Sequence, residues 1–363
     1  MKGSLHLGSV LNVAIKVHWT FLLIIAWVTF LELKSGGNAQ NVFMSILFVL
    51  LVFVCVVLHE FGHILTARKF GVETKKITLL PIGGVASMDT IPENPKEELL
   101  IALAGPAVNI VIALVLAFFV PLQLFFGKAP DSLETTLDHV TLQNLVLYLF
   151  SVNIILALFN FIPAFPMDGG RVFRALLAMK MDRVKATSMA AGLGEIIAFV
   201  FLLIGVLYNP FLILIALFIY FGANAENKMV QQLALIKGHT VEEAMLTNIT
   251  VLKPDNTIED VIEVLLKSTE KNFVVTENDK IVGILHHKDI LSNSNHRELK
   301  VKEVMDISFS SIETTAGLKE VFMLINTKKK DFFAVTKNDR LAGAIDLSNM
   351  SEFMLIQSNL ITR

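Results

Sequence analysis

Long apolar runs separated by short polar segments fill the first two thirds of the chain. An α-helix needs about 20 apolar residues to cross a hydrocarbon layer of roughly 30 Å. Runs of about this length predict six membrane-spanning helices, at about 17–33, 43–67, 98–126, 141–163, 189–207 and 210–226. After Lys228 the pattern changes to the shorter alternation of a soluble α/β domain. The chain is therefore expected to be a polytopic α-helical membrane domain, residues 1–230, followed by a soluble tail that begins near residue 238.

Composition supports a membrane protein. Of 363 residues, 54% are hydrophobic, and the mean hydropathy is +0.63. This is more apolar than a soluble protein of the same length. A formal net charge of −2 gives no indication of a nucleic-acid partner, and a single cysteine, Cys55, excludes an intrachain disulfide framework. The first apolar run lacks a clear cleavage site, so we expect no cleavable signal peptide.

The basic residues of the loops predict the orientation in the membrane. Counted in order, the five predicted loops carry one, five, one, five and no Lys or Arg residues. Loops rich in these residues stay in the cytosol, so both termini are expected there. We expect a multi-pass protein of a prokaryotic cell (inner) membrane. The basic residues of the fourth loop are Arg171, Arg174, Lys180, Arg183 and Lys185.

Three ionisable residues interrupt the second apolar run, within LVFVCVVLHEFGHILTARKF. His59 and His63 are four residues apart and share a helix face, where two imidazoles can hold one Zn²⁺. Glu60 beside them is a candidate general base. Charged residues at the centre of a membrane helix cost about 2.5–3.5 kcal/mol on insertion scales, which makes such residues functional candidates. Cys55, one turn earlier, is either a small apolar helix residue or a further ligand.

A broken helix end places a carboxylate on the same predicted side of the membrane. The stretch NFIPAFPMDGG, residues 160–170, contains two prolines and two glycines, which disrupt regular helix. Catalytic zinc sites commonly have three protein ligands, and Asp168 is the best available third ligand. The alternative is that Asp168 caps the following helix.

The segment LLPIGGVA, residues 79–86, is too apolar for a solvated loop and too short to span the membrane. Its proline and the Gly83-Gly84 pair predict a re-entrant or interfacial hairpin, which could form one wall of an active-site cleft. A plain interfacial loop is the alternative. Asn109 is expected to hydrogen-bond between helices. Glu195 could line a polar path or extend to the cytosolic interface.

The tail contains an internal repeat. VEEAM at 241–245 recurs as VKEVM at 301–305, and the segment from Phe273 recurs from Phe333. Both offsets are 60 residues (301−241 and 333−273), so the two copies align without a gap. Each copy shows an amphipathic helix pattern and then two strands joined by an Asn-Asp turn. The two repeats are placed at 238–297 and 298–363.

Taken together, the membrane motifs resemble those of the site-2 proteases, which are zinc intramembrane metalloproteases. The resemblance covers about residues 5–226 and rests on HEFGH, Gly83-Gly84, the Ala-Gly-Pro at 104–106 and the stretch 160–170. HExxH alone occurs in many metalloproteases, but its combination with a distant Asn-x-x-Pro-x-x-Pro-x-Asp-Gly-Gly is specific. No loop is long enough for a PDZ domain.

This resemblance implies roles for particular residues. His59, His63 and Asp168 match the zinc ligands, Glu60 matches the catalytic glutamate, and Asn160 matches an asparagine near the scissile peptide. The implied substrate is a membrane protein in the lipid bilayer. The residues expected to contact it are Gly83, Gly84 and Pro166.

The tail resembles a pair of CBS domains, an arrangement similar to the family branch that includes sporulation-factor-processing proteases. Such pairs often bind adenine nucleotides such as ATP, with an acidic residue after the second strand holding the ribose hydroxyls. Asp289 matches this position, whereas the second copy has Asn349 there. The alternative is a purely structural pair that joins two chains into a homodimer.

The function predicted from these features is zinc-assisted hydrolysis of peptide bonds in or near transmembrane segments, as in regulated intramembrane proteolysis. Two alternatives use the same residues: a metal-ion transporter gated by its CBS pair, and a catalytically silent scaffold with a structural metal. A transport site has no need of Glu60 beside two helix-spaced histidines. A structural zinc site would normally have a fourth protein ligand, and Cys55 is the residue that could supply it.

Overall fold

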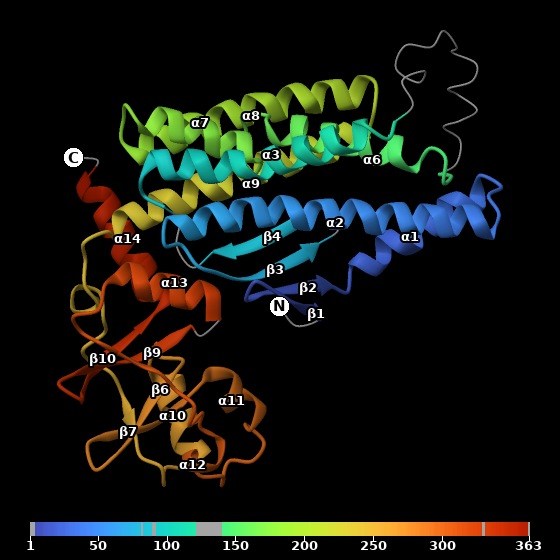
Figure 1. Cartoon of the computed structure of the whole chain (residues 1–363). Helices are drawn as coiled ribbons and strands as arrows, with labels where there is room; N and C mark the ends of the chain where they lie inside the picture. Colours follow the sequence, from blue (N-terminus) through green and yellow to red (C-terminus); the bar gives the residue numbers. More distant parts are fainter. Residues whose placement is uncertain (1–3, 81–82, 89–91, 121–139, 329–330, 362–363) are drawn as a thin grey trace. The chain divides into compact units, whose positions relative to one another are not determined.

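Two compact units make up the chain in the computed structural model, Met1–Lys228 and Met229–Arg363. The structure describes residues 4–80, 83–88, 92–120, 140–328 and 331–361. The first unit combines apolar helices with a small sheet, and the second is an α/β tail (Figure 1).

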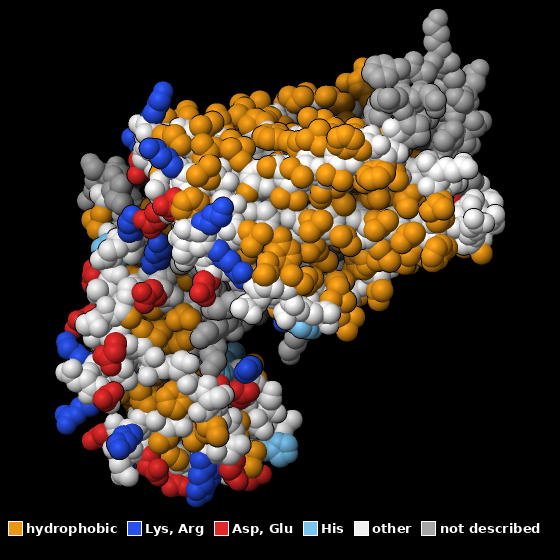
Figure 2. All heavy atoms as spheres, in the orientation of Figure 1, with side chains coloured by type: hydrophobic (Ala, Val, Ile, Leu, Met, Phe, Trp, Pro, Cys, Tyr) orange, Lys and Arg blue, Asp and Glu red, His pale blue; other side chains and the backbone are white. Residues whose placement is uncertain are grey.

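The helices of the first unit follow the predicted apolar runs. Four of them are long and apolar enough to cross a membrane, namely α2, α3, α8 and α9. The helices α1 and α6 have 14 and 16 residues, or about 21 and 24 Å at 1.5 Å per residue, so they are shorter than the hydrocarbon layer. Figure 2 shows hydrophobic side chains covering the visible face of this unit. The helices are α1 Phe21–Lys34, α2 Ala39–Lys69, α3 Pro95–Ala117, α6 Leu145–Asn160, α7 Asp168–Ala178, α8 Arg183–Leu207 and α9 Phe211–Leu235.

The predicted spans differ from the described helices at their ends by several residues. The sixth was expected to end at residue 226, but α9 continues to Leu235. The first was expected from residue 17, but the chain is extended up to His18 and α1 begins at Phe21. The third was expected to reach residue 126, but α3 ends at Ala117, and residues 121–126 lie outside the described part of the chain.

A four-stranded sheet, ordered β1-β2-β3-β4, lies against α2. The hairpin predicted at 79–86 is present as the antiparallel pair β3–β4, with residues 81–82 outside the described part. The hairpin β1–β2 was not predicted. It turns at Leu11 and Asn12, whose φ angles are +51° and +61°. The strands are β1 Ser4–Val10, β2 Val13–His18, β3 Thr74–Leu80 and β4 Gly83–Met88.

The sheet packs on the part of α2 that contains the HEFGH motif. Val13, Ile77 and Leu79 of the sheet form one buried cluster with Phe61 and Ile64 of α2. Phe61 and Ile64 lie on the side of α2 away from the two histidines. The sheet therefore covers the helix face opposite the histidines. Strand β2 runs parallel to β3. Parallel neighbours need a long connection, and here the helices α1 and α2 provide it.

In the tail, each repeat forms a three-stranded sheet with helices, β5-β6-β7 in the first copy and β10-β9-β8 in the second. The predicted Asn-Asp turns are confirmed, because Asn278, Asp279, Asn338 and Asp339 all have φ between +51° and +62°. The elements are η1 Val241–Glu243, β5 Val251–Leu252, α10 Ile258–Lys267, β6 Phe273–Glu277, β7 Lys280–Leu285, α11 His287–Ser292, α12 Val301–Val304, β8 Ser311–Glu313, α13 Leu318–Lys328, β9 Phe332–Lys337, β10 Arg340–Asp346 and α14 Leu347–Ile361.

The N-terminal segment of each copy packs against the other copy. Leu246 bridges to Ala344 of the second copy, and Asp306 bridges to Ile284 of the first. Val241 is accordingly buried in the core of the second copy, and Val301 in the core of the first. Each copy thus contributes a buried residue to the core of the other.

Candidate metal centre

Two histidines of α2 and the first residue of α7 converge on one point. His59 Nε2 lies 3.1 Å from Asp168 Oδ2, His63 Nε2 lies 3.2 Å from the same oxygen, and the two Nε2 atoms are 3.1 Å apart. Ligands bound tetrahedrally to zinc at about 2.0–2.1 Å lie about 3.3 Å from one another. All three residues are buried, and among the described residues they form the group suited to hold a metal ion.

Hydrogen bonding orients one of the imidazoles for this role. His63 Nδ1 lies 2.7 Å from the carbonyl oxygen of Ile101. Because a carbonyl oxygen only accepts, Nδ1 carries the proton and Nε2 offers its lone pair towards His59 and Asp168. Burial alone would raise the pKa of Asp168, but the neighbouring His63 and His59, together with Arg171, hold the pKa of that carboxyl well below its usual range. The aspartate is therefore ionised, as a zinc ligand must be.

A glycine of α3 provides the space for the two imidazoles. A Cβ on Gly105 would lie 2.6 Å from His59 Nε2 and closer still to His63 Nε2. Side-chain carbon atoms do not approach so closely, so an alanine would displace the imidazoles. The close approach of α3 to these two histidines of α2 therefore requires a glycine at this position. The donor set and this cradle fit a zinc ion.

The two residues predicted to be catalytic, Glu60 and Asn160, differ in how close they lie to the three proposed ligands. Glu60 is half-buried, with His63, His59, Asp168 and Arg171 as its ionisable neighbours. Asn160 ends α6, and its side-chain amide donates to Leu156 O within the same helix at 3.0 Å. The structure therefore does not bring the amide of Asn160 into the group of three, and its catalytic role stays a prediction.

Cys55 lies apart from the three predicted ligands. Its sulfur accepts from the buried Asn153 side chain at 3.4 Å, and it is not in the metal-suited group of the described residues. Asn109 is buried on α3 and Glu195 is exposed on α8. Pro166 lies on the loop before Asp168, and a Cβ on Gly222 of α9 would approach it to 2.5 Å.

A buried ion cluster on the same side of the unit was missed. Arg174, 1% exposed, donates through Nε to Glu98 Oε1 at 2.8 Å and through Nη1 to Glu226 Oε1 at 2.5 Å. Arg183 lies 3.2 Å from Glu98 Oε2. The two arginines had been counted only as loop cations. The sequence did contain an indication of the cluster. Glu98 and Glu226 lie at the predicted cytosolic ends of two spans, on the same side of the membrane as the two arginines.

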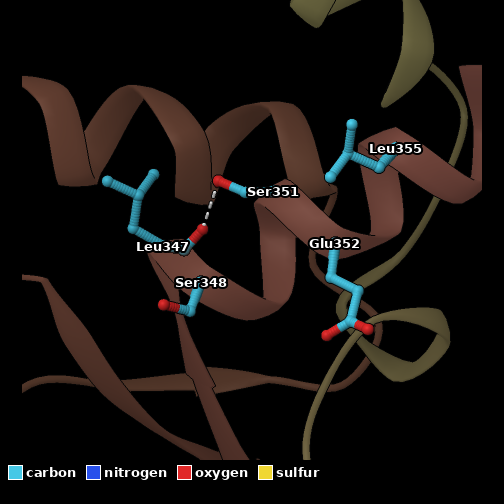
Figure 3. A pocket seen from close by; sticks show the side chains of 5 residues that line it. All are labelled: Leu347, Ser348, Ser351, Glu352 and Leu355. Carbon is cyan, nitrogen blue, oxygen red and sulfur yellow. Dashed lines mark hydrogen bonds between the residues drawn. The ribbon is translucent and has the colours of Figure 1, made fainter.

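In the tail, Asp289 is the third residue of α11, the helix that follows β7, and Asn349 takes the equivalent place in α14. The side-chain oxygen of Asn349 is buried without a hydrogen-bond partner. A pocket of ≈ 480 Å³ lies elsewhere, along α14 (Figure 3). Its lining does not include Asp289 or Asn349, so it does not coincide with the predicted nucleotide site. The lining residues are Leu347, Ser348, Ser351, Glu352 and Leu355.

Helices that bury HExxH beside a distant aspartate, in a unit with four membrane-length helices, define a membrane zinc metalloprotease. Comparison with known proteins agrees. The model of peptidase family M50 matches residues 47–205, and the CBS domain model matches residues 241–296. The zinc metalloprotease MJ0392 of Methanocaldococcus jannaschii is 35% identical over 357 residues, which cover 98% of this chain and 97% of the relative. The chain therefore belongs to peptidase family M50, the site-2 proteases, and carries a C-terminal CBS pair.

Two further relatives are informative. Stage IV sporulation protein FB of Bacillus subtilis is 26% identical over 132 residues, 36% of this chain and 40% of that protein. A solved site-2 protease from Methanocaldococcus jannaschii is 39% identical, with a TM-score of 0.45, and the match covers 62% of this chain and 95% of that chain.

Proposed function

We propose that this protein is an intramembrane endopeptidase that cuts peptide bonds in or near the transmembrane segments of substrate proteins. The observation that carries the proposal is the triangle of His59 Nε2, His63 Nε2 and Asp168 Oδ2, with sides of 3.1–3.2 Å, next to a glutamate on the same helix. His59, His63 and Asp168 would hold Zn²⁺. When bound there, zinc polarises the scissile carbonyl and lowers the pKa of water towards 7.

The remaining chemistry falls to side chains of this chain. Glu60 follows His59 on α2 and so points away from the ligand face, which leaves its carboxylate free to act as a base. It accepts the proton of the attacking water and returns it to the leaving amine. Asn160 is proposed to donate to the oxyanion that develops on the substrate carbonyl, once its amide leaves its bond to Leu156.

The substrate must be extended at the point of cleavage. A helical substrate has its peptide groups hydrogen-bonded within itself, so it unwinds before the bond is accessible. The sheet β1-β2-β3-β4 ends at β4, whose outer edge has no partner strand among the described residues. We propose that the unwound segment adds to this edge near Gly83 and Gly84, as peptides add to other open sheet edges, and passes Pro166.

Orientation and regulation complete the proposal. The distribution of Lys and Arg favours cytosolic termini and a prokaryotic inner membrane. The tail is proposed to bind an adenine nucleotide through Asp289, which lies in the first turn of α11, the helix after β7. Pairing of two tails into a homodimer stays a prediction of the resemblance.

A reconstituted cleavage assay tests the proposal. The purified full-length protein in detergent is mixed with a single-span membrane substrate, before and after treatment with a chelator. We expect cleavage that chelation abolishes and added Zn²⁺ restores. Movement of metal across vesicle membranes without any cleavage would favour a transporter, and bound zinc with neither activity would favour a silent scaffold.

A further inference from the structure

One face of α9 packs against the loop that delivers Asp168. This loop, residues 161–167, connects α6 to α7, and Asp168 is the first residue of α7. Ala164 and Met167 are buried in one cluster with Ile219 of α9. The residue immediately before the proposed ligand thus has α9 in its packing environment.

The same face of α9 reaches the middle of the loop. Phe165 is buried in a second cluster with Ala223 of α9. Pro166 is so close to Gly222 that a Cβ on this glycine would lie 2.5 Å from Pro166 Cδ and 2.9 Å from Cγ. A proline ring cannot rotate away, so the loop and α9 fit together only if residue 222 has no side chain.

One turn further along α9, Glu226 extends the contact to α7 itself. Its carboxylate accepts from Arg174 Nη1 at 2.5 Å, and Arg174 also donates to Glu98 of α3. The guanidinium carbon of Arg174 lies 5.0 Å from the centre of the Phe165 ring, within the loop. Arg174 therefore joins α3, α7, α9 and the loop, and removal of one carboxylate would leave a buried charge incompletely paired.

The helix that makes these contacts does not end with the first unit. It runs without interruption from Phe211 to Leu235, across the division after Lys228. Beyond that point Met229 and Leu233 pack against the core of the tail.

We propose that this face of α9, formed by Ile219, Gly222, Ala223 and Glu226, positions Asp168 for metal binding, with Glu226–Arg174 as its electrostatic clamp. We call it the support face. Its members are positioning residues, since they act on the metal through the loop and α7. The inference rests on the proposed function only in taking Asp168 as a ligand. Groups that orient ligands typically contribute 10–100-fold to metal affinity or activity.

Retention of zinc tests the support face in two matched pairs. Glu226→Gln removes a charge from the clamp, and Glu195→Gln makes the same change at an exposed position on α8. Gly222→Ala adds a methyl against Pro166, and Gly192→Ala adds one on α8, where no atom lies within 4 Å. Each full-length, zinc-loaded variant is placed in chelator, and bound zinc is measured over time. We expect the two support-face variants to lose zinc about 10–100-fold faster than their controls.

A spectroscopic measurement separates positioning from general loss of stability. In Co²⁺-loaded protein, the visible absorption bands report the coordination geometry. Both support-face variants should show altered bands at temperatures where they remain folded, and both controls should match the unmodified protein. If Glu226→Gln fails to fold, Gly222→Ala decides the matter, because alanine favours helix over glycine.

Equal zinc loss and unchanged cobalt spectra in all four variants would overturn the inference. This failure is distinct from failure of the proposed function. A protein that retains zinc normally but cleaves no substrate contradicts proteolysis and leaves the support face intact. A protein that cleaves normally with either support-face substitution, and with unchanged zinc retention, contradicts the support face alone.

Discussion

At the scale of the residue, the site depends on what surrounds the ligands as much as on the ligands. HExxH and a distant aspartate could be read from the sequence, because chemistry limits which side chains bind zinc. The space at Gly105 and the bond from His63 to Ile101 O could not be read, since they depend on how closely α2 and α3 approach. Arg174 was missed because an arginine near a span end is most often solvated.

Gly105→Ala should weaken zinc binding without adding or removing a ligand. The new methyl would occupy the space of the two imidazole Nε2 atoms, so at least one must turn away. We expect the loss to exceed the roughly 10–100-fold typical of outer-shell changes. Zinc content after dialysis measures it, with Gly192→Ala as the control. Full zinc occupancy in Gly105→Ala would show that α3 is further from the site than described.

Asp168→Asn should also lower zinc occupancy, because it removes the negative charge of the third proposed ligand while keeping its shape. The same dialysis assay applies, with a cleavage assay in parallel. Normal metal content in this variant would place the third ligand elsewhere. Cys55, now in contact with Asn153, would then have to be tested by Cys55→Ala.

At the scale of the element, the long helices and the repeat of the tail followed from periodicity. Alternation of apolar residues in Val13–His18 was present, but no strand was predicted there, and the last two residues fell in the predicted first span. Short strands next to a membrane run are hard to separate from it, because both are apolar. The parallel pairing of β2 with β3 also required knowledge of the tertiary fold, since the paired residues are 62 positions apart in the sequence (76−14).

Unwinding of the substrate helix is expected to limit cleavage. Two Ala→Gly changes near the cut site weaken a helix by about 1.6–2 kcal/mol, because glycine costs about 0.8–1.0 kcal/mol relative to alanine. If all of this energy opposes cleavage, the rate should rise about tenfold or more. Initial rates measure it, with the same two changes at the far end of the transmembrane segment as control. Equal rates for both substrates would argue that cleavage does not require local unwinding.

At the scale of the whole molecule, membrane unit and tail are connected by α9, which contributes to the cores of both. A ligand of the tail can alter proteolysis only if it favours one conformation of the tail over another. The sequence identified the two modules, and their exact bounds stay a prediction. It did not identify the packing of each N-terminal segment against the other repeat, because each such segment matches its own repeat equally well in sequence.

An adenine nucleotide should bind chiefly through the half that contains Asp289, and its binding should change the cleavage rate. A typical coupling of 1–3 kcal/mol corresponds to a change of about 5–150-fold. Calorimetry and cleavage assays on the full-length protein, with and without ATP, test both statements. Asp289→Ala should weaken both nucleotide binding and the change in cleavage rate. Asn349→Ala should reduce both quantities less than Asp289→Ala does. No heat of binding and no change in rate would leave the tail as a docking or dimerisation module.

The central claim is that Glu60 acts as the base at a metal held by His59, His63 and Asp168. Glu60→Gln tests it most directly, when zinc content and single-turnover cleavage are measured on the same sample. We predict a full complement of zinc and a rate reduced at least about 10²–10⁴-fold, the usual contribution of a general base. Glu195→Gln, the matched control, should retain both. Cleavage at the unmodified rate in Glu60→Gln would contradict the mechanism, and loss of zinc would make Glu60 a ligand.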